Sequence, residues 1–212
     1  SGVDVNVTVT CRDDKKKDRK DFRKDCNDCQ VKCRESITAL LSLINTLTLA
    51  ITDPSASLIE FFHCELDPTS TTGNLGNVTD CTFSVVPESG ENEITFITDT
   101  LDALCIEPAA ITPNLFELLL SYLQSVPDSV CNNDDEKEDS KFVCDCCFKT
   151  IELQLQVFFT ANIQLQINIG CESFTGFIFK ICNGIIYLVD DLIVPTIIYA
   201  IPICKILSYQ PQ

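Results

Sequence analysis

Fourteen cysteines in a chain of 212 residues constrain what this sequence can fold into more than any other feature. Ordinary cytosolic proteins carry far fewer, because their compartment keeps thiols reduced, whereas small disulfide scaffolds carry a larger share. The even count of fourteen allows up to seven bridges but does not determine which cysteines pair. Three interpretations stay open: bridges within the chain in an oxidising compartment, bridges between subunits of an assembly, and a metal cluster.

The rest of the composition predicts a folded, acidic protein and excludes several classes of function. A chain with 45% hydrophobic residues can bury a substantial core and is not disordered. Its formal net charge of −16 argues against a nucleic acid partner, because phosphates are bound by Lys and Arg. The single histidine, His63, removes most hydrolase triads and histidine-based metal sites. We therefore predict no enzyme activity, no cofactor and no small-molecule substrate.

His63 lies beside Cys64, which raises the question of a Cys–His dyad. Residues that are neighbours in sequence seldom form such a dyad, because the members of a catalytic pair usually meet in space. We therefore expect a histidine in the core or at its rim.

The N-terminal end combines a strand pattern with a basic segment. Valines at every second position predict a terminal strand, which pairs within its own domain or is donated to the edge of a neighbour's sheet: Val3, Val5, Val7 and Val9. Residues 12–34 hold ten of the fifteen basic residues and six acids, a balance of +4, whereas residues 35–212 carry −19. The basic segment is either a solvated helix face or a positive arm that docks on an acidic surface.

A helical stripe runs through and beyond this basic segment. Apolar residues and cysteines recur there at spacings of three and four: Phe22, Cys26, Cys29, Cys33, Ile37, Leu40, Ile44, Leu47 and Ile51. This spacing predicts one helix over 13–51, broken before Asp53-Pro54 because a residue that precedes proline disfavours the helical conformation. Residues 41–51 also fit a strand, but we prefer the helix.

Two cysteine clusters are candidate sites. Cys26, Cys29 and Cys33 can hold zinc or an iron–sulfur cluster only with a fourth ligand, and no local cysteine completes the set. Placed on a strand, Cys144 and Cys146 share a face and Cys147 points away, which suits bridges to two separate neighbours, within the chain or across a subunit contact. The candidate cross-linking cysteines are Cys11, Cys26, Cys29, Cys33, Cys144, Cys146 and Cys147.

The first half of the remaining chain mixes short elements. Asp53 and Pro54 predict the start of a short helix within 54–65. Residues 67–80 are polar and predict a loop, and the apolar runs on either side of the sequence PESGEN predict a β-hairpin over 81–98. Thr112 is the expected N-cap of a helix near 113–125.

The C-terminal part predicts strands. Apolar residues at odd positions from 151 to 169 indicate a half-buried sheet, either a hairpin that turns near 160–162 or one long strand. Residues 174–206 are apolar on both faces, which predicts strands covered on both sides. Within the most apolar stretch, charged residues and prolines interrupt any membrane span: Asp190, Asp191, Pro195 and Pro202.

These patterns predict an α+β fold, with an antiparallel β-sheet or sandwich body, a long N-terminal helix and one or two shorter helices. Three regions follow. Residues 1–11 form an N-terminal strand or arm, 12–53 a charged, cysteine-striped helix, and 54–212 a β-rich body with a helix near 113–125.

The strand and cysteine at Val3–Cys11, the set at 144–147 before an amphipathic segment, and the lack of a visible signal peptide resemble the cysteine-rich structural proteins of bacterial endospore surfaces. Those families form appendage fibres and exosporium or coat layers. The long charged helix and the few glycines depart from them. The resemblance implies a self-assembling filament or array at the spore surface or outside the cell, hardened by disulfides within and between subunits, with itself as partner.

Two other functions remain as alternatives. One is a secreted, disulfide-stapled monomeric binding module. The other is a metal- or thiol-dependent redox protein.

Overall fold

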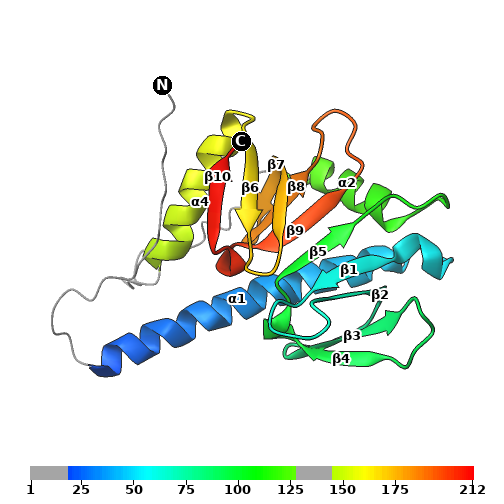
Figure 1. Ribbon diagram of the computed structural model, residues 1–212, viewed down its shortest axis with the longest axis horizontal. Coiled ribbons are helices and arrows are strands. Elements are labelled where there is room, and N and C mark those ends of the chain that lie inside the picture. The colour runs from blue at the N-terminus through cyan, green and yellow to red at the C-terminus, as the bar shows by residue number, and fades with distance from the viewer. Residues whose placement is uncertain (1–18, 128–144) are drawn as a thin grey trace.

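The fold is known from a computed structural model, which describes residues 19–127 and 145–212, with side chains for 30–127 and 151–212. Ten strands form one sheet in the order β10-β6-β7-β8-β9-β5-β1-β2-β3-β4, and every neighbouring pair is antiparallel (Figure 1). Together with the three α-helices of the described residues, this confirms the predicted α+β class.

The strands are β1 (Ile59–Phe62), β2 (Ser70–Val78), β3 (Thr82–Pro87), β4 (Ile94–Ile97), β5 (Ala103–Ile106), β6 (Gln164–Asn168), β7 (Ser173–Cys182), β8 (Ile185–Val189), β9 (Ile198–Pro202) and β10 (Ser208–Pro211). The α-helices are α1 (Arg19–Thr48), α2 (Leu115–Ser125) and α4 (Asp145–Thr160). Short 3-10 helices are η1 (Pro54–Ser57), η2 (Thr98–Thr100) and η3 (Ile203–Lys205).

The central strands bury both of their faces, as the apolar sequence of 174–206 predicts. On β8, Tyr187 packs on one face in the core that α1 and α2 share. Its neighbour Leu188 packs on the other face, in the core that includes Leu155 of α4. Because successive strand residues point to opposite faces, a strand covered on both sides needs apolar residues at every position.

The described side chains of helix α1 pack on the sheet mainly through its second half. Three buried residues of the predicted stripe make this contact, Ile37, Leu40 and Ile44, together with Leu41, which the stripe did not include. Burying each side chain contributes about 2 kcal/mol relative to exposure. The helix continues to Thr48, so the alternative strand over 41–51 is wrong. Residues 13–18 of the predicted helix lie outside the described residues.

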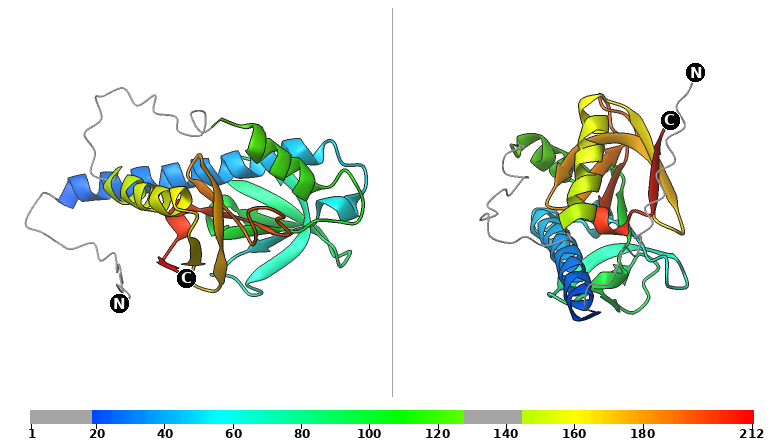
Figure 2. Two further views of the ribbon diagram at one scale, coloured as in Figure 1. Left: turned by 90° about the horizontal axis from the view of Figure 1, so that it is seen from above. Right: turned by 90° about the vertical axis from the view of Figure 1, so that its left-hand side faces the viewer.

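The first turns of α1 extend past the sheet (Figures 1 and 2). Cys33 is the first described residue of α1 that packs against the core.

The predicted sheet over 151–160 is wrong, because this segment belongs to α4. Ile151, Leu155, Phe158 and Phe159 follow helical spacing and face one core. At the odd positions between them, Leu153 is 59% exposed and Val157 64%. The alternation holds only for β6, where Leu165 and Ile167 are buried.

The predicted loop at 67–80 is also wrong, because β2 occupies most of it. This polar strand pairs with β1 on one side and β3 on the other. Its backbone hydrogen bonds to these two neighbours stabilise it, although its sequence lacks the apolar alternation of a strand. Gly73 permits a close approach, since a Cβ there would lie 2.4 Å from the carbonyl oxygen of Val86.

The short helix expected within 54–65 is reduced to η1. Asp53 caps it as predicted and accepts from the Ser55 amide at 2.9 Å. Residues from Ile59 onward pair with two strands as β1 instead.

Two further predictions concern the hairpin over 81–98 and the helix near 113–125. The hairpin over 81–98 is confirmed as β3 and β4. Helix α2 begins at Leu115 with Asn114 as its N-cap, which replaces the predicted Thr112; the Asn114 side chain accepts from the Glu117 amide at 3.0 Å.

Candidate functional site

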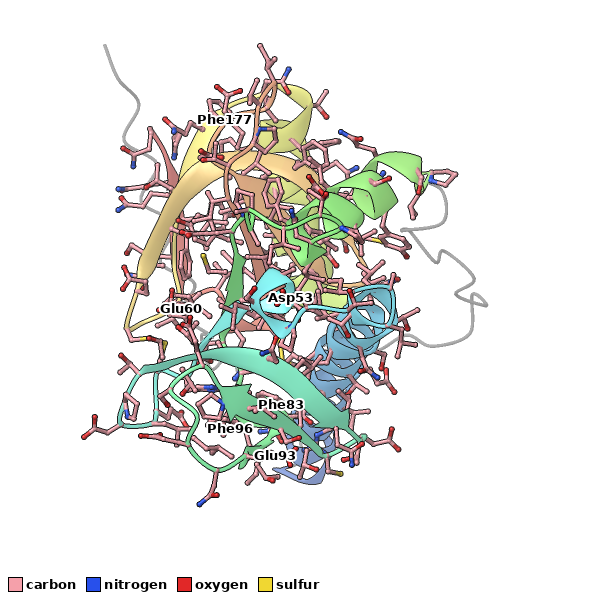
Figure 3. The ribbon with its side chains drawn as sticks, turned by 90° about the vertical axis from the view of Figure 1, so that its right-hand side faces the viewer. Asp53, Glu60, Phe83, Glu93, Phe96 and Phe177 are labelled. Carbon is pink, nitrogen blue, oxygen red and sulfur yellow. A yellow bond between two sulfur atoms is a disulfide. The ribbon has the colours of Figure 1, made fainter. Side chains whose placement is uncertain are left out.

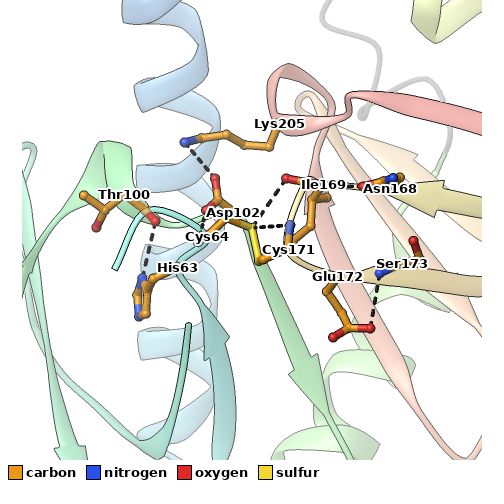
Figure 4. Close-up of a disulfide and its surroundings, with 11 residues drawn as sticks. His63, Cys64, Thr100, Asp102, Asn168, Ile169, Cys171, Glu172, Ser173 and Lys205 are labelled. Atoms are coloured by element: carbon orange, nitrogen blue, oxygen red, sulfur yellow. Dashed lines mark hydrogen bonds and ion pairs between the residues drawn. A yellow bond between two sulfur atoms is a disulfide. The ribbon is translucent and has the colours of Figure 1, made fainter. Parts of the chain in front are cut away.

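Two disulfides meet in one part of the fold, which we call the junction. Cys33–Cys204 joins α1 to η3, and Cys64–Cys171 joins the end of β1 to the β6–β7 turn (Figure 4). The paired cysteines are 171 and 107 residues apart in sequence. Closing loops of this length removes much freedom from the unfolded chain, about 4–5 kcal/mol per bridge in the chain-entropy model.

Charged side chains surround the two disulfides. Arg34, next to Cys33, pairs with the carboxylate of Asp99, and its Nε donates to Asp99 Oδ1 at 2.9 Å. Lys205, next to Cys204, donates to the Asp99 carbonyl at 2.6 Å and lies 3.1 Å from Asp102 Oδ1 (Figure 4). The ion pairs therefore hold the same elements together as the disulfides.

Asp102 is the innermost charge of the junction. Only 8% of this residue is exposed. Its Oδ2 accepts from the backbone amide of Cys64 at 2.6 Å, so that Asp102 positions the residue that forms the second disulfide. Nearby, the hydrogen bond from Arg34 holds the pKa of Asp99 below its usual range. The carboxylates of the junction are thus engaged in protein contacts.

His63 is a buried core histidine. Its ring stacks on Phe96 with centroids 4.2 Å apart, and its Nδ1 lies 3.3 Å from the Thr100 carbonyl oxygen. Burial lowers the pKa of the imidazole, which favours the neutral ring. The sulfur of the neighbouring Cys64 is bonded to Cys171, so these two residues do not form a Cys–His dyad.

Two described cysteines are free thiols. Cys105 is buried, and this burial raises its pKa to about 12, which keeps the thiol protonated and unreactive. Cys81 is exposed in the turn between β2 and β3. Among the described cysteines, Cys81 combines a free thiol with access to solvent, so it can form a bridge to another molecule.

The candidate cysteines of the sequence have different outcomes. Cys33 lies in the junction, bonded to Cys204. Cys26 and Cys29 lie on α1, and Cys146 and Cys147 on α4, but their side chains are outside the described part of the chain. Outside the described residues altogether lie Cys11, Cys144, Val3, Val5, Val7 and Val9.

The strand geometry that we predicted for the second cluster is wrong for Cys146 and Cys147. Both are in α4, where adjacent residues differ in direction by about 100° rather than pointing to opposite faces.

The candidate list omits six cysteines of the described structure, namely Cys64, Cys81, Cys105, Cys171, Cys182 and Cys204. None belongs to a local cluster, and the only signal was the total count. Each bridge joins elements that are not neighbours in the strand order, since β8, β9 and β5 lie between β7 and β1, and Cys33 lies on α1 outside the sheet.

Among the described side chains, those of residues 30–127 and 151–212, no group of three or more from His, Cys, Asp or Glu is arranged to hold a metal ion. The disulfide at Cys33 also takes that sulfur away from the cluster with Cys26 and Cys29. None of the helices in this part of the chain is long and apolar enough to cross a membrane.

No family model, curated protein or solved structure matches this chain. What the protein does is therefore argued from its own geometry. The chain is cysteine-rich and disulfide-bonded. Its disulfides are compatible with an extracellular protein.

Proposed function

We propose that this protein is a structural subunit that self-assembles into a filament or array outside the cell, stabilised by disulfides within and between subunits. The junction is the observation that supports this most. Its sulfur and charged groups bind to one another and fasten α1, β1 and η3 together. Groups engaged in this way resist unfolding but are not free to act on a substrate.

The open sheet supplies a route to assembly. A sheet that does not close into a barrel leaves unpaired backbone groups at its edges, and such edges can accept a further strand. The two edge strands are β4 and β10. The apolar edge is β4, with Ile94 37% and Ile97 59% exposed, whereas β10 is polar and contains Pro211. We propose that the valine-rich segment of residues 1–11 is donated to such an edge in a neighbour.

We propose that disulfides between subunits then cross-link the assembled polymer. Cys81 is an exposed free thiol close to the end of β4, since the amide of Thr98 donates to the Cys81 carbonyl at 2.8 Å. The resemblance to the structural proteins of endospore surfaces supports the same proposal, and we propose the spore surface as the location of the polymer.

Gel electrophoresis with and without reductant tests this function. The proposal predicts a ladder, or material that does not enter the gel, and its collapse to 23.6 kDa on reduction. Electron microscopy of the oxidised protein should show filaments or sheets. A single monomer band without reductant, together with dispersed particles, would contradict the proposal.

That outcome would favour a disulfide-stapled monomeric binding module. The observation that supports this alternative is that both described disulfides lie within one chain.

A further inference from the structure

A groove of about 550 Å³ lies between the loop that follows β1 and the β3–β4 turn. Its lining mixes apolar side chains with carboxylates. The apolar residues are Leu66, Pro68, Pro87, Ile94 and Phe96. The carboxylates are Asp67, Glu88 and Glu91.

The apolar side of this groove is firmly supported. Phe96 stacks on the buried ring of His63 and lies 5.4 Å from Phe83, centroid to centroid (Figure 3). Phe83 is fully buried in the core that α1 covers. The wall is thus formed before any partner binds, so a partner does not have to order it.

The three carboxylates are exposed, and none forms a salt bridge with any described residue. Carboxylates beside an apolar wall fit a lysine or arginine side chain, whose methylene stem packs on apolar surface while its charged head stays near the acids. The groove therefore suits a basic peptide segment rather than an anion or a purely apolar ligand.

We propose that this groove receives the basic segment of residues 12–24 from a second copy of the chain. This inference rests on the proposed self-assembly and names the surface that accepts the neighbour. The segment holds eight of the fifteen basic residues of the chain and four acids, whereas residues 35–212 carry a net −19. The two surfaces are thus complementary in charge, which speeds encounter and determines their relative orientation.

The position of α1 explains why the neighbour, and not the same chain, is the acceptor. Helix α1 is fastened to the body at Cys33, and it begins at Arg19. At 1.5 Å per residue, the part of the helix that precedes Cys33 spans about 20 Å. The figures show this end of the helix extending past the sheet (Figures 1 and 2). The described part of the basic segment, residues 19–24, therefore lies at the end of the helix that extends past the sheet.

The donor and acceptor surfaces are different parts of the molecule, so each copy can bind one neighbour at its groove and another at its basic segment. Such a heterologous contact builds an open filament unless the rotation closes a ring. The groove accordingly favours the filament among the assemblies considered above.

Charge reversal in the full-length protein tests the inference. Glu88→Lys with Glu91→Lys reverses the groove, and Lys15→Glu with Lys16→Glu reverses the segment. At low salt, each pair alone should slow assembly by about tenfold, measured by light scattering and electron microscopy. The combination of all four changes should restore assembly, because the complementarity is restored with opposite signs.

The control is Glu117→Lys with Glu172→Lys, which makes the same change in net charge at exposed positions outside the groove. If the groove variant assembles at the rate of the wild type, or no more slowly than this control, the inference is wrong. Thermal unfolding of every variant separates a folding defect from a binding defect. Only variants with the wild-type melting temperature enter the comparison.

A labelled synthetic peptide of residues 12–24 separates this inference from the proposed function. Fluorescence anisotropy with the full-length wild type should show binding that weakens about tenfold in the Glu88→Lys, Glu91→Lys protein. Binding should also be lost near 1 M salt, where the Debye length falls to about 3 Å. Peptide binding without polymer would contradict the proposed function alone, whereas polymer without groove-dependent peptide binding would contradict the groove alone.

Discussion

The middle of the strand order and its β4 end are stabilised in different ways. All five residues of β8 are buried, whereas three of the four residues of β4 are exposed. The same antiparallel hydrogen bonding runs through both regions, so the difference lies in the side chains. The β6–β9 region is held by apolar burial, which at β8 covers both faces. The β1–β4 region buries Phe61, Phe83 and Val85 in the core that α1 covers, and it is also fastened by the junction and by the stack of His63 with Phe96. The junction therefore adds covalent links to the region whose edge strand is more exposed.

Removal of the Cys33–Cys204 bridge should cause the largest loss of stability. We expect Cys33→Ser with Cys204→Ser to lower the free energy of unfolding by about 4 kcal/mol, because the bridge closes a loop of 171 residues. Urea denaturation under non-reducing conditions measures this loss. Cys81→Ser is the matched control and should change the value by less than about 0.5 kcal/mol. A loss no larger than that of the control would show that the junction does not stabilise the fold.

A cavity in the β6–β9 region should cause the second-largest loss of stability. Leu188→Ala removes a fully buried side chain from β8 and should cost about 3 kcal/mol. Hydrogen exchange shows where the loss falls, and we expect faster exchange in β7, β8 and β9. A uniform increase that includes β2 and β3 to the same extent would mean that the two regions unfold as one unit.

Neutralising the inner charge of the junction should have an intermediate effect. Asp102→Asn keeps the size of the side chain but removes the ion pair with Lys205, and we expect a loss of about 2 kcal/mol. The exposed Asp80→Asn is the control and should be neutral. Equal values for the two variants would show that the ion pair adds nothing to the disulfides.

Acidification should have the smallest effect, and it acts through His63. Burial lowers the pKa of this imidazole in the folded state, whereas the unfolded chain binds the proton near pH 6.5. Stability is therefore complete above pH 6.5 and falls as the pH drops below it, by at most about 1.4 kcal/mol per pH unit. His63→Phe should remove this part of the pH dependence while keeping the stack.

Denaturation of the wild type and the His63→Phe variant at pH 7.5 and 5.5 measures this difference. Because the chain has one histidine, its imidazole NMR signal can be assigned without ambiguity. A midpoint of titration at or above pH 6.5 in the folded protein would contradict the prediction.

Patterns confined to one element were predicted well from the sequence. The spacing of Ile37, Leu40 and Ile44 predicts the buried face of α1, because a helix repeats every 3.6 residues whatever surrounds it. The continuous apolar residues of β8 predict coverage on both faces for a similar reason. The alternation over 151–160 misled us, because Leu153 and Val157 are apolar side chains that the fold leaves exposed.

The candidate site was predicted only in part. Cys33 was among the candidates, but its partner Cys204 and the entire Cys64–Cys171 bridge were not. No local pattern marks them, because pairing depends on distances between residues more than 100 positions apart in sequence.

The sequence by itself determined a cysteine-rich, acidic chain with a basic N-terminal segment, a striped helix and, over 174–206, strands that are apolar on both faces. These properties belong to composition and to periodicity, which local stereochemistry dictates. Only the tertiary structure decided which cysteines meet, that 151–160 is helical, that the polar residues of β2 form a strand, and that carboxylates and apolar side chains share one groove. Each of these depends on which distant segments become neighbours in the folded chain, and no local pattern of residues encodes that.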